Sequence, residues 1–76
     1  MKIKVFAILK EFYEEDFTVE NFSSIEQLKF FLIEQNPQAS DILNKSRFAI
    51  NNKFVTSDTP INYGDTIYIM PHSSGG

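Results

Sequence analysis

The chain has 76 residues, of which 42% are hydrophobic and 22% are charged, and it contains no cysteine. A chain of this length forms one small domain with a single core, and that core cannot depend on disulfides or on cysteine-bound zinc. The net charge of -3 argues against nucleic acid as a partner, because proteins that neutralise phosphate backbones carry clustered basic residues. The composition therefore excludes thiol chemistry on side chains and disfavours a large enclosed active site.

The first 22 residues predict a hairpin of two strands. Residues 2–9 are mostly apolar and rich in branched and aromatic side chains, which predicts a strand with Ile3, Val5, Ala7 and Leu9 on one face. Residues 16–22 alternate between apolar and polar side chains and predict the second strand. The apolar run near the N-terminus is too short for a signal sequence or a membrane span, so we expect a cytoplasmic protein with no membrane association.

A helix is predicted over residues 25–35. Ser23-Ser24-Ile25-Glu26 has the spacing of a capping box, in which a hydroxyl accepts from the third helical amide and a glutamate reaches back. The apolar stripe of this helix comprises Ile25, Leu28, Phe31 and Leu32 and continues to Gln35. Asn36-Pro37 ends the helix, because a residue before proline avoids the helical region.

The second half of the chain predicts short strands. Residues 38–45 are expected to form one further helical turn, and residues 47–51 and 53–55 two short strands around a turn-prone pair of asparagines. The last strand is predicted over residues 66–70, with Ile67 and Ile69 opposite Tyr68 and Met70.

This order of elements predicts an α+β fold of the β-grasp, or ubiquitin-like, type. A hairpin, a helix and further strands bury their apolar faces when one main helix packs across one face of a mixed sheet of about five strands. The first and last strands are strongly apolar, so we expect them to be central neighbours. We divide the chain into a β-grasp domain, residues 1–70, and a mobile C-terminal tail, residues 71–76, which ends in two glycines.

Four segments carry a resemblance to a known family. They are the strand Ile3-Lys4-Val5-Phe6-Ala7, the segment Ala49-Ile50-Asn51-Asn52, the segment Asp58-Thr59-Pro60-Ile61-Asn62-Tyr63-Gly64-Asp65-Thr66-Ile67 and the terminal Gly75-Gly76. Together they resemble the small, sulfur-carrying subunit of molybdopterin synthase, a β-grasp protein that ends in Gly-Gly. The chain departs from that family where Tyr63 replaces an acidic residue and where Pro71-His72-Ser73-Ser74 replaces Pro-Pro-Val-Ser or Pro-Pro-Val-Thr.

The resemblance implies a carrier that is not itself an enzyme. An E1-like enzyme uses ATP to adenylate the Gly76 carboxylate, and a sulfur-donating enzyme supplies the sulfur that replaces AMP and leaves a thiocarboxylate. The tail then enters the large subunit of molybdopterin synthase, in a heterotetramer, and donates sulfur to cyclic pyranopterin monophosphate. The residues expected to thread into the partners are Pro71, His72, Ser73, Ser74 and Gly75. No permanently bound cofactor and no metal are expected.

Some apolar residues admit two interpretations. Alternation places Phe6, Ile8, Tyr68 and Met70 on the sheet face away from the helix, where they either form a docking surface for a partner or are covered by residues 38–45 or by a neighbouring strand. Phe30 and Ile33, outside the helical stripe, leave the same alternatives open.

Rival functions also remain open. One is a thiamine-pathway sulfur carrier, although the long connection over residues 10–15 resembles the molybdopterin form more closely. Another is a ubiquitin-like modifier joined to lysines through Gly76. The third is a structural or regulatory module without C-terminal chemistry.

Overall fold

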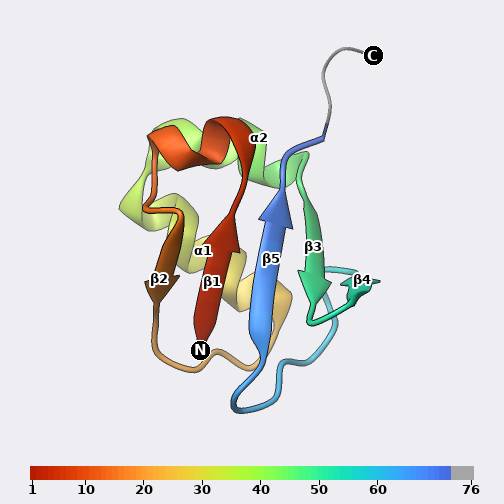
Figure 1. Ribbon diagram of the computed structural model, residues 1–76. Coiled ribbons are helices and arrows are strands. Elements are labelled where there is room, and N and C mark those ends of the chain that lie inside the picture. Colours follow the sequence, from red (N-terminus) through yellow and green to blue (C-terminus); the bar gives the residue numbers. More distant parts are fainter. Residues whose placement is uncertain (73–76) are drawn as a thin grey trace.

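The computed structural model describes residues 1–72, which form a five-stranded mixed sheet with a long helix across one face (Figure 1). In chain order the elements are β1 (Lys2–Val5), the 3-10 helix η1 (Ala7–Glu11), β2 (Asp16–Thr18), α1 (Ile25–Gln35), the 3-10 helix η2 (Pro37–Ala39), α2 (Ser40–Asn44), β3 (Arg47–Ile50), β4 (Lys53–Val55) and β5 (Thr66–Met70). Ser73, Ser74, Gly75 and Gly76, for which the sequence predicts a mobile tail, lie outside the described residues.

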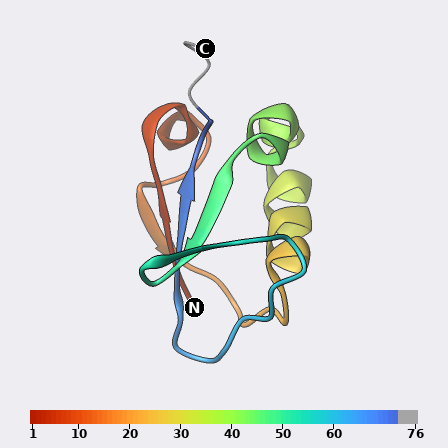
Figure 2. The same ribbon diagram turned by 90° about the vertical axis from the view of Figure 1, so that its right-hand side faces the viewer.

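The sheet has the strand order β2-β1-β5-β3-β4. β1 and β5 run parallel at its centre, with Ile3 opposite Ile67 and Val5 opposite Ile69, whereas every other neighbouring pair is antiparallel. The prediction that the first and last strands are central neighbours is confirmed. So is the β-grasp architecture, because α1 packs across one face of this mixed sheet (Figure 2).

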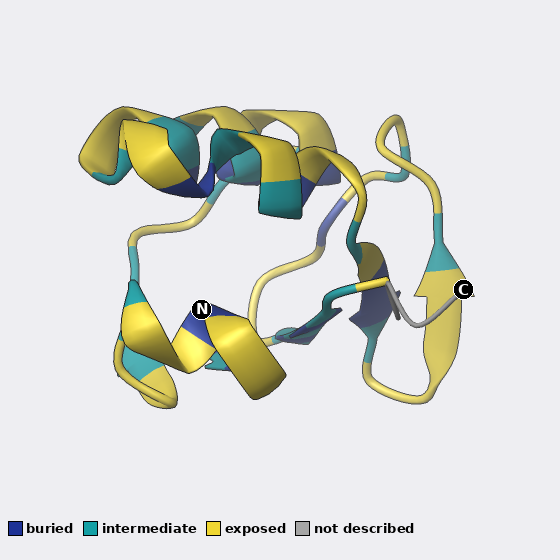
Figure 3. Ribbon diagram, turned by 90° about the horizontal axis from the view of Figure 1, so that it is seen from above, coloured by how far each residue is buried: buried dark blue, intermediate teal, exposed yellow. Residues whose placement is uncertain are grey.

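The core lies between α1 and the inner face of the sheet. Viewed from above, the buried residues of the helices lie toward the sheet and the exposed residues lie on the outer side (Figure 3). The core residues are Ile3, Val5, Leu9, Ile25, Leu28, Leu32, Ala39, Leu43, Phe48, Ile61, Ile67 and Ile69. Full burial of one such large side chain contributes about 1.5–3 kcal/mol, so this cluster stabilises the domain without disulfides. Within the predicted stripe of α1, Phe31 is only half-buried and Gln35 is exposed.

α1 has the predicted bounds, but its cap lies one residue later than the capping box that the sequence suggested. The Gln27 amide donates to Ser24 Oγ at 3.4 Å, and the Ser23 amide donates to Gln27 Oε1 at 3.0 Å. Gln27 therefore takes the role that the sequence assigned to Glu26. The Glu26 side chain is exposed, while its backbone amide donates to the Ser57 carbonyl at 2.8 Å.

The first strand is shorter than predicted. β1 ends at Val5, and Ala7, with a φ of 56°, begins η1 instead of continuing the strand. Leu9 still reaches the core, but it does so from a 3-10 helix, and 47% of the Ile8 surface is exposed. A short apolar run satisfies strand and helix alike, so the sequence pattern did not reveal this bend.

The second strand also ends early, since β2 stops at Thr18. Val19 still donates its amide to the Met1 carbonyl at 3.0 Å, and the chain then leaves the sheet. The remaining local predictions agree more closely: residues 38–45 contain the end of η2 and all of α2, and β3 and β4 fall where short strands were expected.

The connection after η1, residues 12–15, is hydrogen-bonded to the C-terminal end of α1. The Tyr13 hydroxyl donates to the Leu32 carbonyl at 2.5 Å, and Asn36 Nδ2 donates to the Phe12 carbonyl at 3.0 Å. Burial raises the pKa of Tyr13, and its hydrogen bond with Asn36 opposes that rise. These contacts fix the long connection between β1 and β2 that the sequence showed only as a polar stretch.

Candidate functional site

The candidate site begins where β5 leaves the sheet. β5 lies between β1 and β3, and its Ile69 carbonyl accepts a hydrogen bond from the Phe6 amide at 3.2 Å. Pro71 follows as a half-buried residue and has no N–H to continue the ladder, and His72 is exposed. The predicted tail therefore begins directly at the end of a central strand (Figure 1). The other predicted tail residues, Ser73 to Gly76, lie outside the described residues.

An apolar depression lies beside this base, on the sheet face away from α1. We call it the outer patch and define it by Phe6, Ala49, Phe54, Tyr68 and Met70. The Phe6 and Tyr68 rings lie 6.3 Å apart between centroids, and Ala49 stands opposite both Tyr68 and Phe54 in register. Together with Asn51 and Asn52, these residues line a volume of about 210 Å³.

The outer patch contains three of the four residues predicted to form a docking surface. Phe6, Tyr68 and Met70 gather there and are half-buried. Ile8 does not line the depression, because β1 ends before it and η1 carries it elsewhere. The alternative that residues 38–45 cover this face is wrong, because α2 packs on the α1 side and contributes Leu43 to the core (Figure 2).

Ala49, Phe54 and Arg47 extend the predicted surface. The Arg47 guanidinium lies 5.3 Å from the centroid of the Phe54 ring, over the edge strand β4. These residues were missed because their position depends on the pairing of β3 with β5, which alternation within one strand does not show. Arg47 adds a positive charge to the rim of an otherwise apolar patch.

Asn51 and Asp65, from two of the segments that resemble the family, stabilise the turns at the end of the sheet opposite Pro71. Asn51, with a φ of 55°, donates from Nδ2 to Asp65 Oδ1 at 3.4 Å and accepts from the Thr66 amide at 3.3 Å. Asp65 also accepts from the Asn62 amide at 2.9 Å. Gly64, with a φ of 89°, supplies the left-handed conformation of this turn. Tyr63, where the chain departs from the family pattern, is 86% exposed and does not disturb it.

Asn51→Ala is expected to destabilise the fold by about 1–2 kcal/mol, because it removes these hydrogen bonds and places alanine at a positive φ. Urea unfolding measures the change. Asn52→Ala is the matched control, since the exposed Asn52 side chain makes no hydrogen bond within residues 1–72. Equal losses in the two variants would contradict a structural role for Asn51.

Within residues 1–72, no charged side chain is buried, and no three His, Asp or Glu residues are grouped to hold a metal ion. Of the helices in this part of the chain, none has the length and apolar character needed to cross a membrane.

Sequence comparison matches residues 3–76 to the ThiS family. The chain belongs to the ThiS family. The match covers nearly all of the β-grasp domain together with the tail. Membership in this family confirms the resemblance to the β-grasp sulfur carriers that the sequence segments suggested.

Several solved structures have the same fold. SAMP1 from Haloferax volcanii has a TM-score of 0.73 at 19% identity, covering 99% of this chain and 97% of its own. A chain from the complex of subunits 1 and 2 of the molybdopterin-converting factor from Helicobacter pylori 26695 has a TM-score of 0.71 at 22% identity. The match covers 99% of this chain and 96% of that chain. A putative molybdopterin converting factor subunit 1 from Pyrococcus furiosus has a TM-score of 0.74 at 17% identity. The match covers 92% of this chain and 93% of that chain. At these identities the similarities establish the shared fold.

Proposed function

We propose that this protein is the sulfur carrier of molybdenum cofactor biosynthesis and that its working group is the C-terminal carboxylate of Gly76. The observation that carries the proposal is the position of the tail base, at the end of central strand β5 and beside the outer patch. Family membership and the fold shared with molybdopterin-converting factor proteins support it. The chain acts in the cytoplasm as a substrate of its partners and not as a catalyst.

The chemistry takes place on the terminal carboxyl group. An E1-like enzyme transfers AMP from ATP to the Gly76 carboxylate, releases pyrophosphate and leaves an acyl adenylate with a good leaving group. Hydrosulfide supplied by a donor enzyme then attacks the acyl carbon, the bond to AMP breaks, and the products are the thiocarboxylate and free AMP. Negative charge on the carbonyl oxygen is stabilised by hydrogen-bond donors of the partner. The glycines at positions 75 and 76 suit this role because a Cβ would obstruct a narrow channel.

The outer patch gives both partners a surface next to the tail. Six residues follow Met70, and an extended chain spans at most about 3.3–3.6 Å per residue, which gives roughly 20 Å. A partner that binds the patch must therefore hold its active site within that distance. The large subunit of molybdopterin synthase meets this condition in our proposal, where the thiocarboxylate donates sulfur to cyclic pyranopterin monophosphate.

Intact mass measurement of the protein purified from its native cell tests the proposal. We expect a fraction of the molecules to show the mass increase of an oxygen-to-sulfur exchange, localised to Gly76 by fragmentation. We also expect a large synthase subunit to co-purify.

The rival functions give different results. A thiocarboxylate without the large subunit would favour the thiamine pathway. An isopeptide adduct at Gly76 would favour a protein modifier. An unmodified terminus in cells that actively make the cofactor would contradict the carrier role.

A further inference from the structure

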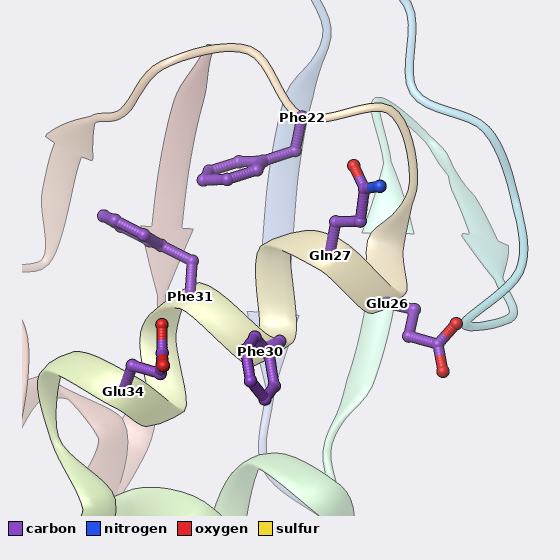
Figure 4. A pocket seen from close by; sticks show the side chains of 6 residues that line it. All are labelled: Phe22, Glu26, Gln27, Phe30, Phe31 and Glu34. Carbon is purple, nitrogen blue, oxygen red and sulfur yellow. The ribbon is translucent and has the colours of Figure 1, made fainter.

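A second apolar groove lies on the outer side of α1, where it is lined by Phe22, Glu26, Gln27, Phe30, Phe31 and Glu34. Its volume is about 530 Å³. The Phe22 and Phe31 rings lie 5.0 Å apart between centroids at 44° and form one part of it. Figure 4 shows these two rings beside each other, with Phe30 on the helix between the Glu26 and Glu34 side chains.

Helical spacing explains why Phe30 stands between two charges. Glu26, Phe30 and Glu34 are four residues apart and form one row on the helix surface, with about 5–6 Å between successive Cβ atoms. Leu28 and Leu32 on the opposite side bury the helix against the sheet. Phe30 therefore contributes nothing to the core, and 62% of its surface is exposed.

The two glutamates of the row have no cationic partner in the described chain. Within residues 1–72 the ion pair formed is Lys4 with Asp16, at 3.9 Å on the opposite face of the sheet. Lys29, the lysine of α1, lines a different groove, beside β4. An exposed aromatic ring between two unneutralised carboxylates attracts a cation through the face of the ring and through charge.

We propose that this groove binds a segment of a partner protein that presents an arginine beside an apolar side chain. The planar guanidinium stacks on Phe30 and donates hydrogen bonds to Glu26 and Glu34, which an ammonium group does less well. The apolar neighbour packs on the Phe22–Phe31 pair. Removal of these aromatic surfaces from water supplies the remaining affinity.

The groove and the outer patch lie on opposite sides of the molecule, because α1 covers the inner face of the sheet and the outer patch lies on the other face (Figure 2). A groove partner and a patch partner can therefore bind at the same time. This inference does not depend on the chemistry proposed for Gly76.

The test is a titration of the ¹⁵N-labelled full chain with a capped peptide of alternating leucine and arginine, followed by two-dimensional NMR. We expect saturable shifts of the backbone amides of Phe22, Gln27, Phe30 and Phe31, and none from the peptide in which glutamate replaces arginine. Equal responses to both peptides, shifts centred on the outer patch, or no saturable shift would each overturn the proposal. Concentration-dependent shifts of these amides without peptide would show a second copy in the groove and would overturn it as well.

Variants distinguish binding in the groove from non-specific binding of the peptide. Phe30→Ala and the double variant Glu26→Gln, Glu34→Gln change exposed positions and should leave the remaining amide spectrum intact. Each is expected to lower the affinity for the arginine peptide roughly three- to tenfold, which is the effect of one exposed cation–π contact or two exposed ion pairs. Phe54→Ala, in the outer patch, is the control and should not change the affinity. A chain that lacks Gly75 and Gly76 should bind the peptide equally well, which separates this result from the carrier role.

Discussion

Removal of Gly75 and Gly76 is expected to abolish sulfur transfer and to leave the melting temperature nearly unchanged. The whole core lies between Ile3 and Ile69, and residues beyond the last strand contribute little to stability. Without the terminal glycine, the carboxylate is displaced from the partner's reaction centre, and proximity alone accounts for several orders of magnitude in rate. The measurements are product formation with the large subunit and a thermal melt of the free chain.

His72→Ala is the control for the truncation, because it changes an exposed side chain of the same tail and keeps the terminus. We expect a small effect on product formation. Loss of folding in the truncated chain would contradict the division into domain and tail. Full activity of the truncated chain would support a structural module and contradict the carrier role.

Tyr68→Ala and Phe54→Glu are expected to weaken binding of the large subunit by about 30-fold or more, the effect of losing an interface anchor worth at least 2 kcal/mol. Tyr68 lies at the centre of the outer patch, and Phe54 is an exposed aromatic residue at its edge. Calorimetric titration of the two subunits measures the change. A melt of each variant shows whether the domain remains folded.

Ile8→Ala is the matched control for the outer patch. Ile8 is apolar, 47% exposed and close in sequence to Phe6, but it does not line the depression. We expect the affinity of this variant to stay within about twofold of the parent, as for peripheral contacts. A loss equal to that of Tyr68→Ala would move the docking surface away from the outer patch.

The helix and the last strand were predictable from local signals. Ser24 and Asn36-Pro37 bound α1 through a cap and a proline, and the 3.6-residue spacing of Ile25, Leu28 and Leu32 identifies its buried face. In β5, period-two alternation separates buried Ile67 and Ile69 from Tyr68 and Met70. Each of these signals depends on neighbours within a few residues.

The ends of the first two strands were not predictable in this way. Residues 5–9 form one apolar run that suits a strand and a helix alike, yet the chain enters a 3-10 helix at Ala7, from which Leu9 fills the core. This bend also affects the candidate functional site, because it removes Ile8 from the predicted docking surface. Ala49 and Phe54 joined the surface through cross-strand register, which only the folded sheet sets.

By itself the sequence determined the β-grasp class and the central position of the two most apolar strands, because hydrophobic period, caps and turn residues are local properties. The family was indicated by the four segments that resemble it and by the match over residues 3–76. Only the tertiary structure decided which side chains share a surface. It joined Ala49 of β3, Tyr68 of β5 and Phe6, which follows β1, into the outer patch, and it placed Phe22 beside Phe31. Such groupings depend on register and on where the chain bends, and these are set by packing between residues far apart in the sequence.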